Sequence, residues 1–545
     1  MDVEKQIPSA GVESDSTTPL PQASHDHLYR EKTSTETSNR ANANVPSIGS
    51  SAEATERAEG DIEKALETTD LPATPIPEDP FLVKWDGPLD PENPMNWAIA
   101  RKWYVTFITS LATFTVSFAS SVFSQATKQT AEEFQVSDIV MTLATSFVVL
   151  GFAFGPLIWG PLSELYGRMI PLWIGFGGFT ILHIPVATAQ NVATILIFRF
   201  LIGIFGSSTL AIIGGMLADF WDPVARGVAV ATFASATFIG PVAGPIVGAF
   251  VVNSHLGWRW TAWLTFILSA TFGIIAAATV PETYAPVILQ RRAARLRRET
   301  KNWALHSQLD EHSPTMSEII TKYFSRPLHM LFMEPILLLL TIYLSLIYGM
   351  LFLFFFSYPV SFQEVRGWEN PGIAALPFLG LFGGILIGLA LIVYTTKTRY
   401  AQQMKKQGRA VPEERLPPVI IGAIALPVGL FWFSWTSSPD ILWVSQTLAG
   451  IPIGFGIVVI FLQGVNYIID VYLMFANSAM AANTFMRCVC AAAFPLFGVQ
   501  MYHKLGVNWA GSLLGFLSVA MVPVPILFYV YGEKIRGMSR YSPKM

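Results

Sequence analysis

The sequence predicts an all-α membrane protein with twelve transmembrane helices in two six-helix bundles, preceded by a disordered N-terminal tail. Three observations predict this class. First, only 13% of the 545 residues are charged and 52% are hydrophobic, whereas a soluble domain carries about a quarter charged residues. Second, the apolar residues fall in runs of about 20, the length that spans a hydrocarbon core. Third, one long charged stretch, 282–330, divides these runs into two sets of six.

The twelve apolar segments follow one another through short polar links. In the first half they cover 103–126, 139–161, 171–189, 192–215, 228–252 and 261–280. In the second half they cover 332–358, 372–394, 417–436, 441–465, 478–502 and 509–531. The chain is therefore expected to divide into a tail over 1–80, an N-terminal six-helix bundle over 81–281, a central loop over 282–330, and a C-terminal six-helix bundle with a short tail over 331–545.

The tail and the loops set the expected orientation. Residues 1–80 are rich in Ser, Thr, Glu, Ala and Pro and cannot bury enough apolar surface to fold. If this tail is cytosolic, the inner loops and the C-terminal tail hold 20 Lys and Arg residues, while the outer loops hold four. Basic residues favour the cytosolic side of a membrane. Both termini are therefore expected in the cytosol.

The stretch GPLSELYGR links the second and third segments. Gly160 and Gly167 permit a tight turn, and Glu164 and Arg168 place opposite charges at the membrane face. Glu164 lies near the C-terminal end of its own helix, where the helix dipole disfavours a negative charge. It therefore needs a partner elsewhere, and the N-terminus of the eleventh helix at Asn477 would serve. The alternative is an ordinary surface turn.

Two arginines lie well inside apolar segments. Arg199 is seven residues into the fourth segment, and Arg487 lies in the eleventh. A guanidinium at that depth is costly, so it faces a cavity or a partner more often than lipid. The alternative for Arg199 is a side chain that reaches the outer headgroups, about 10 Å away.

The fifth segment contains FIGPVAGPIVGAF, in which Gly240, Gly244 and Gly248 recur at i+4 spacing. Such a row of small residues lets another helix approach closely. Pro241 and Pro245 each remove a backbone donor and bend the helix. We expect a bent, tightly packed interface helix here, with ordinary membrane packing as the alternative. A similar glycine row in the eighth segment is assigned to ordinary packing.

Together these features resemble the major facilitator superfamily, and the paired Gly-Pro motif resembles the signature of its drug:proton antiporters. Four further stretches narrow the resemblance: NPMNW (93–97), GWRW (257–260), PETYAPVILQRRAARLRRET (281–300) and PEERLPP (412–418). They resemble the twelve-spanner drug:proton antiporter family of fungi, which includes polyamine, drug and toxin exporters. The resemblance covers about residues 80–545.

The resemblance implies two bundles that rock about a central cavity, with the substrate bound near the midplane. It implies that Gly160, Glu164, Gly167 and Arg168 form an inner gating motif and that Arg199 takes part in proton coupling. It also implies that the Gly-Pro row of the fifth segment is the antiporter helix. The plasma membrane is the expected location, with the vacuolar membrane as the alternative.

The residue that carries the proton stays open. Many drug antiporters have a carboxylate in the first span, and residues 103–126 contain none. Asp219, Glu334 and Asp470 lie near inner helix ends. His183 in the third segment titrates in the right pH range, and a packed, hydrogen-bonded histidine is the alternative.

No motif names the substrate. An apolar cavity with aromatic walls suits amphiphilic organic compounds, and Tyr343, Tyr348 and Arg487 are the candidate lining residues. Most phenylalanines of LFLFFF (351–356) are expected to face lipid. The expected function is export of drugs, toxins or secondary metabolites by proton antiport. The alternatives are a proton-coupled nutrient symporter and a polyamine exporter, although the spans offer few acids to bind polyamines.

Other function classes lack sequence support. The chain shows no converging catalytic set, no metal-spaced His/Cys set and no G-x-x-x-x-G-K-[ST] phosphate loop. We therefore expect no enzyme activity, no cofactor, no metal and no ATP-driven transport. No basic patch interleaved with aromatic residues points to nucleic acid. The expected partners are a small organic substrate, protons and the lipid bilayer, and the expected state is a monomer.

Overall fold

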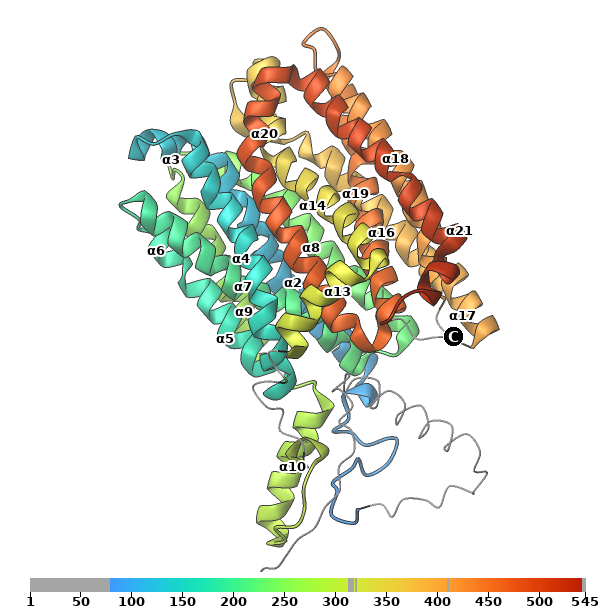
Figure 1. Ribbon diagram of the computed structural model, residues 1–545. Helices are drawn as coiled ribbons and strands as arrows, with labels where there is room; N and C mark the ends of the chain where they lie inside the picture. The colour runs from blue at the N-terminus through green and yellow to red at the C-terminus, as the bar shows by residue number, and fades with distance from the viewer. Residues whose placement is uncertain (1–78, 312–317, 319–320, 409–410, 542–545) are drawn as a thin grey trace, which may run out of the picture. The chain divides into compact units, whose positions relative to one another are not determined.

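The computed structural model describes residues 79–311, 318, 321–408 and 411–541, and every regular element in this part of the chain is a helix (Figure 1). The predicted disordered tail, 1–80, lies outside the described residues except for its last two. The one pairing of extended segments within them is a single bridge between Leu82 and His306. The predicted all-α class is confirmed.

The first half of the described chain forms helices α2 to α9. Their bounds are α2 Ile99–Val122, α3 Thr127–Phe134, α4 Asp138–Leu165, α5 Met169–Ile181, α6 His183–Ala187, α7 Val192–Phe220, α8 Pro223–Val252 and α9 Arg259–Thr279. α2 packs along α8, α4 packs along α7, and α9 packs on α2, α5 and α6. The first six predicted segments each coincide with one of these helices, the third with α5 and α6 together.

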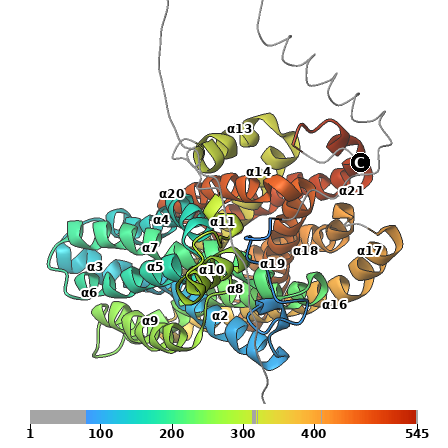
Figure 2. The same ribbon diagram turned by 90° about the horizontal axis from the view of Figure 1, so that it is seen from below.

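The second half forms helices α13 to α21. Their bounds are α13 Arg326–Met333, α14 Pro335–Pro359, α15 Pro371–Ala375, α16 Phe378–Thr395, α17 Ala401–Gln407, α18 Leu416–Trp435, α19 Trp443–Tyr472, α20 Ala476–Met521 and α21 Pro523–Gly537. α14 packs along α20, and α16 and α18 both pack along α19. Figure 2 shows α3 to α7 on one side and α16 to α18 on the other, with α8 and α19 between them.

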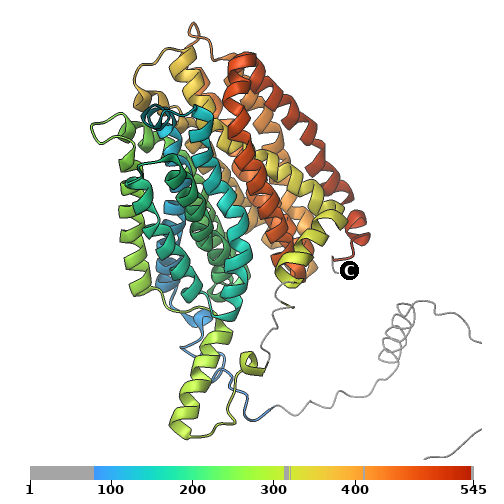
Figure 3. The ribbon, with the colours of Figure 1, turned by 60° about the vertical axis from the view of Figure 1, so that its left-hand side comes forward.

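A sharp turn inside α20 separates the last two predicted spans. Gly506 has φ 73° and ψ 162° there, a backbone conformation that residues with a Cβ rarely adopt. The chain turns back at this point, so that the first part of α20 and the helix that follows run in opposite directions (Figure 3). Eleven described stretches are long and apolar enough to cross a membrane, and the last, Ala476–Gly537, contains this turn. Together they hold the twelve predicted spans.

The phenylalanine-rich part of α14 is buried, which corrects one expectation. Phe352, Phe354, Phe355 and Phe356 are each at most 7% exposed, although the sequence analysis placed most of these rings against lipid. α14 packs against α13, α19 and α20, so protein rather than lipid surrounds these rings. Exposed apolar side chains lie nearer the start of α14, such as Leu339, and on outer helices, such as Ile274 of α9.

Residues 79–97 and 282–311 pack against each other beyond one end of the helical bundle (Figure 1). This region contains α10 Ala285–Thr300 and the short α11 Gln308–Glu311. We call this end of the bundle the α10 end, and the opposite end, where α3 lies, the α3 end (Figure 1).

Ion pairs hold residues 79–97 against α10. Arg292 of α10 contacts Asp86 and Asp90, with its Nη1 2.6 Å from Asp90 Oδ2. The backbone N–H of Asp86, the Arg292 guanidinium and the backbone N–H of Glu92 all donate to Asp90, and they lower the pKa of this carboxyl to about 2. Asp90 therefore stays ionised at neutral pH, and the ion pair persists.

Candidate functional site

The turn between α4 and α5, predicted as a gating motif, is built around Gly167 and a carboxylate from another part of the chain. Gly167 has φ +88°, and a Cβ added there would lie 2.5 Å from Glu282 Oε2. Glu282 accepts hydrogen bonds from the backbone N–H groups of Arg168 at 2.9 Å and Met169 at 3.2 Å. Its negative charge therefore caps the N-terminus of α5. Glycine is required at position 167 both for the backbone conformation and for the space.

Arg168 is the centre of a charged network at the α10 end. Its Nε donates to Asp219 Oδ2 at 3.0 Å, and its Nη1 donates to Ser163 Oγ at 3.2 Å. The guanidinium also lies over the ring of Tyr284, 4.5 Å from the centroid. Burial alone would lower the pKa of Arg168, but the charge and hydrogen bonds of Asp219 outweigh it and raise the pKa. The network ties the α4–α5 turn to the end of α7 and to the start of the central loop.

Glu164 reaches across to the second half of the chain. Its Oε1 accepts from Asn477 Nδ2 at 3.0 Å, and its Oε2 lies 2.6 Å from Lys322 Nζ. Asn477 is the neighbour that the helix-dipole argument pointed to, and Lys322 is an addition that the sequence did not suggest. We call Glu164, Lys322 and Asn477 the α10-end latch. Its role in gating stays a prediction.

A second charged group joins the two halves at the α3 end. Lys128 Nζ of α3 lies 3.0 Å from Glu364 Oε1, and His503 Nε2 of α20 lies 2.7 Å from Glu364 Oε2. We call Lys128, Glu364 and His503 the α3-end latch. The sequence analysis missed it, because an exposed lysine, glutamate and histidine at distant positions form no recognisable motif.

Arg199 is buried and held by backbone carbonyl groups. The residue as a whole is 2% exposed. Nε donates to the carbonyl oxygen of Ala144 at 3.0 Å, and Nη1 donates to that of Ala119 at 3.1 Å. The guanidinium also lies 4.8 Å from the ring centroid of Phe123. This geometry excludes the alternative in which Arg199 extends to the outer headgroups, and its role in proton coupling stays a prediction.

His183 is a packed histidine in this structure. It is 1% exposed, and its Nδ1 lies 2.8 Å from the carbonyl oxygen of Phe179. The ring also contacts the Phe179 ring, with centroids 4.7 Å apart. Nε2 has no hydrogen-bond partner among the described residues. The structure agrees with the alternative of a packed, hydrogen-bonded histidine. Because Nε2 has no partner among the described residues, proton coupling by His183 stays a prediction.

The glycine row of α8 packs directly on the backbone of α2. A Cβ added at Gly240 would lie 2.8 Å from Phe118 N, and one added at Gly244 would lie 2.8 Å from Val122 N. Gly248 meets the Val122 carbonyl group in the same way. α8 continues as a helix through Pro241 and Pro245.

The glycine row of the eighth segment has the same geometry. A Cβ at Gly384 of α16 would lie 2.8 Å from Phe455 N of α19. Both rows therefore serve close helix packing, and geometry alone does not make the row in α8 an antiporter signature.

An arginine and three aromatic rings meet where the two halves face each other. The Arg487 guanidinium lies 5.0 Å from the ring centroid of Tyr348 and 4.6 Å from that of Phe461. Phe461 of α19 in turn contacts Phe238 of α8, with centroids 4.9 Å apart. We call Arg487, Tyr348, Phe461 and Phe238 the central aromatic group. In the described part of the chain, no ring contact or hydrogen bond joins Tyr343 to it.

Within the central aromatic group, the Arg487 guanidinium has hydrogen-bond partners for only some of its nitrogen atoms. Arg487 Nη1 donates to Asn483 Oδ1 at 3.2 Å, and its Nη2 lies 3.5 Å from Thr484 Oγ1. The Arg487 Nε is buried and has no hydrogen-bond partner among the described residues. A buried donor without a partner favours a ligand that supplies an acceptor.

Residues 109–495 match the sequence description of the Major Facilitator Superfamily. The chain belongs to the major facilitator superfamily. The predicted family and fold are thereby confirmed, and the protein is a multi-pass membrane transporter rather than an enzyme.

Relatives of known name cover most of the transporter. The citrinin biosynthesis cluster MFS transporter mrr1 of Monascus ruber is 60% identical over 470 residues, which are 86% of this chain and 94% of that protein. The ascochitine biosynthesis cluster MFS transporter of Didymella fabae is 57% identical over 467 residues, which are 86% of this chain and 90% of that protein. Both organisms are fungi, in agreement with the fungal resemblance of the sequence.

A solved structure supports the fold independently. The proton:xylose symporter XylE matches with a TM-score of 0.56 at 17% sequence identity, over 80% of this chain and 96% of that one. At this identity the match concerns the arrangement of helices and carries no information about the substrate or the direction of transport.

Proposed function

We propose that this transporter exports small amphiphilic organic compounds, of the kind formed as fungal secondary metabolites or toxins, in exchange for protons. The observation that carries the proposal is the central aromatic group, which places a cation and several rings between the two halves of the chain. Relatives named for the biosynthesis clusters of citrinin and ascochitine support the substrate class.

The two latches support alternating access as the mechanism. In this structure Glu164 contacts the second half at the α10 end, and Glu364 contacts the first half at the α3 end. Opening one end has to break the ion pairs of that end together with the helix packing that joins the two halves there, such as the packing of α4 on α20. Ion pairs as exposed as these contribute about 0–1 kcal/mol each, so they add little to the cost of opening either end.

Proton coupling through Arg199 and His183 is part of the proposal. The carboxylates that the sequence offered have other partners: Asp219 pairs with Arg168, Asp470 pairs with Arg415, and Glu334 accepts from Tyr472 and Ser539. His183, with a buried Nε2 that lacks a described partner, is the candidate carrier. Arg199, a buried cation on α7, would then respond to the charge of that proton.

The proposed setting follows from the loop charges and from the exposed apolar side chains of the outer helices. The α10 end faces the cytosol with both termini, the transporter lies in the plasma membrane as a monomer, and lipid covers the outer helices. The vacuolar membrane is the alternative location. The four sequence segments 1–80, 81–281, 282–330 and 331–545 remain the proposed division of the chain.

Two other cargo classes are the alternatives. A polyamine exporter is disfavoured because the cation of Arg487 repels a polycation at the central aromatic group. A proton-coupled nutrient symporter would share the fold and would reverse the direction of substrate flow.

An efflux panel tests the proposal. The full chain is expressed in a yeast strain that lacks its own drug pumps, and the cells are exposed to aromatic organic acids, neutral aromatic compounds and polyamines. Cell-associated compound is measured by mass spectrometry, with Arg199→Ala at matched membrane levels as the control. We expect lower accumulation of aromatic amphiphiles and unchanged polyamines. Lower polyamines alone would support the polyamine alternative, higher accumulation would support import, and no change in any compound would contradict the proposal.

A further inference from the structure

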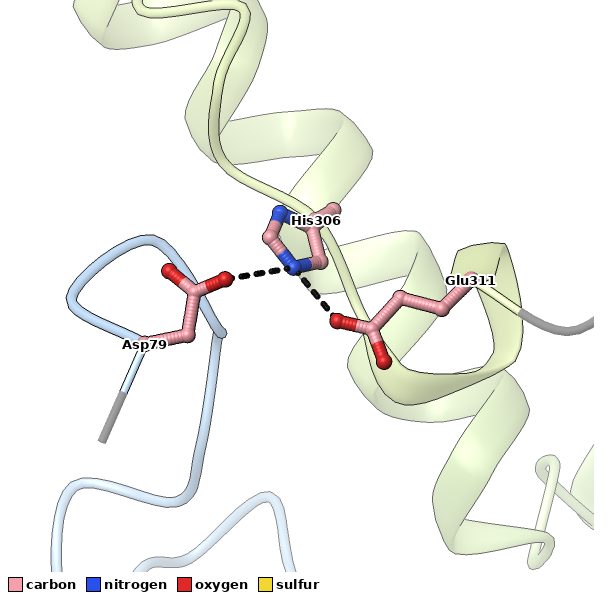
Figure 4. A group of neighbouring side chains, drawn as sticks. All are labelled: Asp79, His306 and Glu311. Atoms are coloured by element: carbon pink, nitrogen blue, oxygen red, sulfur yellow. Dashed lines mark hydrogen bonds and ion pairs between the residues drawn. The ribbon is translucent and has the colours of Figure 1, made fainter. Parts of the chain in front are cut away.

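Three side chains of types that commonly bind metal ions converge beside α10, outside the membrane-spanning helices. Asp79, His306 and Glu311 come from the segment before the first span, the loop after α10, and α11 (Figure 4). His306 Nε2 lies 2.8 Å from Glu311 Oε1 and 3.4 Å from Asp79 Oδ2. The sequence analysis found no metal-spaced set, because these residues meet only through folding.

The orientation of the imidazole ring is fixed from its other side. His306 Nδ1 lies 2.8 Å from the carbonyl oxygen of Ala304, a group that can only accept. Nδ1 therefore carries a proton, and in the neutral ring Nε2 carries a lone pair that points at two carboxylates. Such an arrangement is repulsive unless a positive species lies between them. That species is either a second proton on Nε2 or a metal ion.

Backbone hydrogen bonds hold two of the three residues, His306 and Asp79, in place before any ion binds. Val83 N–H donates to the His306 carbonyl oxygen at 2.8 Å, and His306 N–H donates to that of Phe81 at 3.1 Å. Asp79 uses Oδ1 to accept from Phe81 N–H at 2.8 Å, which leaves Oδ2 for the ring side. Preorganised ligands of this kind lose little entropy when an ion binds.

We propose that Asp79, His306 and Glu311 form a binding site for a divalent transition-metal ion, with Zn²⁺ as the best fit. All three ligand atoms lie within 4.8 Å of one another, and a tetrahedral Zn²⁺ site separates its ligand atoms by about 3.3 Å. Small rotations of the two partly exposed carboxylates close that difference. Water takes the fourth position.

The ligand types select the metal. One imidazole and two carboxylates suit Zn²⁺ and its neighbours in the first transition row. Mg²⁺ and Ca²⁺ prefer six or more oxygen ligands. The hydrogen bond from Nδ1 to a backbone carbonyl is the outer contact that metal-bound histidines usually make.

The bound ion would fasten residues 79–97 to the loop after α10. Asp79 lies at one end of that segment, and Arg292 holds its middle through Asp86 and Asp90. α10 begins at Ala285, three residues after Glu282, which caps α5 beside Arg168. The metal site would therefore be a third attachment in this region, after the ion pairs of Arg292 and the cap formed by Glu282, which contacts the α4–α5 turn. This inference does not depend on which substrate is transported.

Metal binding by the intact transporter tests the site. The full chain is purified in detergent with a tag that contains no histidine, and His25 and His27 of the tail are replaced by alanine in every sample. Zn²⁺ binding is measured by competition with a chromogenic chelator. His306→Ala removes the central ligand, and Glu311→Gln keeps the shape of a second ligand but removes its charge. His329→Ala is the matched control, because it replaces a histidine of α13 that is not part of the site.

We expect one Zn²⁺ per chain in the reference protein and in His329→Ala. Zn²⁺ binding is lost in His306→Ala, and its affinity falls by at least about tenfold in Glu311→Gln. Even replacing a residue that only hydrogen-bonds a metal ligand lowers metal affinity by that factor. Excess Mg²⁺ does not compete. Amide hydrogen exchange at residues 81–83 slows when Zn²⁺ is added to the reference protein only.

Three results would overturn the proposal. One is no stoichiometric Zn²⁺ at micromolar protein, which would leave a proton between the ring and the carboxylates. Another is equal binding by all four proteins, which would place the ion elsewhere. The last is equal loss in His329→Ala, which would mark a general effect of histidine removal.

Discussion

At the scale of single residues, the burial of Arg199 bears most directly on the proposed proton coupling. Arg199 is a buried cation whose described hydrogen bonds go to two backbone carbonyls, one on α2 and one on α4. Neutral acceptors offset the cost of burying a charge only in part. A cation held in this way responds strongly to any charge that appears nearby, which is the property that proton coupling needs.

Replacing Arg199 with lysine should keep the charge and lose the planar fork that reaches both carbonyls. One hydrogen bond from a charged group is worth about 1.5–3 kcal/mol, so transport should fall by at least about tenfold while the protein still inserts. The measurement is substrate efflux per membrane-localised protein. Near-normal transport by both Arg199→Lys and Arg199→Ala would remove this residue from the mechanism.

At the scale of elements, the sequence predicted the helices and missed most of what joins them. Hydropathy locates spans because each must be apolar over its full length. Gly167, Arg168 and Asn477 were also found from local chemistry. Glu282 and Lys322 were not, because their partners lie in other parts of the chain and no local pattern marks them.

The burial of α14 was missed for a related reason. A helix that is apolar all round is compatible with lipid on one side or with protein on every side. The sequence of residues 351–356 does not distinguish the two, and only the packing of α19 and α20 decides it.

The contact between α8 and α2 makes a graded prediction. Because a Cβ at Gly244 would lie 2.8 Å from Val122 N, even Gly244→Ala must move a backbone, and Gly244→Leu must separate the helices. Overpacking of this kind costs about 1–3 kcal/mol. We expect a lower melting temperature in detergent for Gly244→Ala and little folded protein for Gly244→Leu.

Gly214 of α7 is the matched control for this series, because a Cβ added there meets nothing within 4 Å. Gly214→Ala should melt like the reference protein. If Gly244→Ala melts at the same temperature as Gly214→Ala, the two helices are not in the close contact described here.

At the scale of the whole molecule, the two halves meet through helix packing, chiefly α4 on α20 and α8 on α16, through the central aromatic group and through one latch at each end. The family assignment and the twelve spans were predictable from sequence, since both rest on local patterns. The latches were not, because each joins side chains from opposite halves. In the proposed mechanism they are among the contacts that break in turn when substrate passes.

Proton-driven accumulation in inside-out membrane vesicles tests the central claim most directly. The vesicles carry the full chain, contain no ATP and have an acidic lumen, and the substrate is a compound exported in the yeast panel. The proposed antiport predicts that protons leaving the lumen drive the compound in, that a protonophore abolishes accumulation, and that vesicles with Arg199→Ala do not accumulate it. Accumulation that persists with the protonophore, or that requires ATP, would contradict the account.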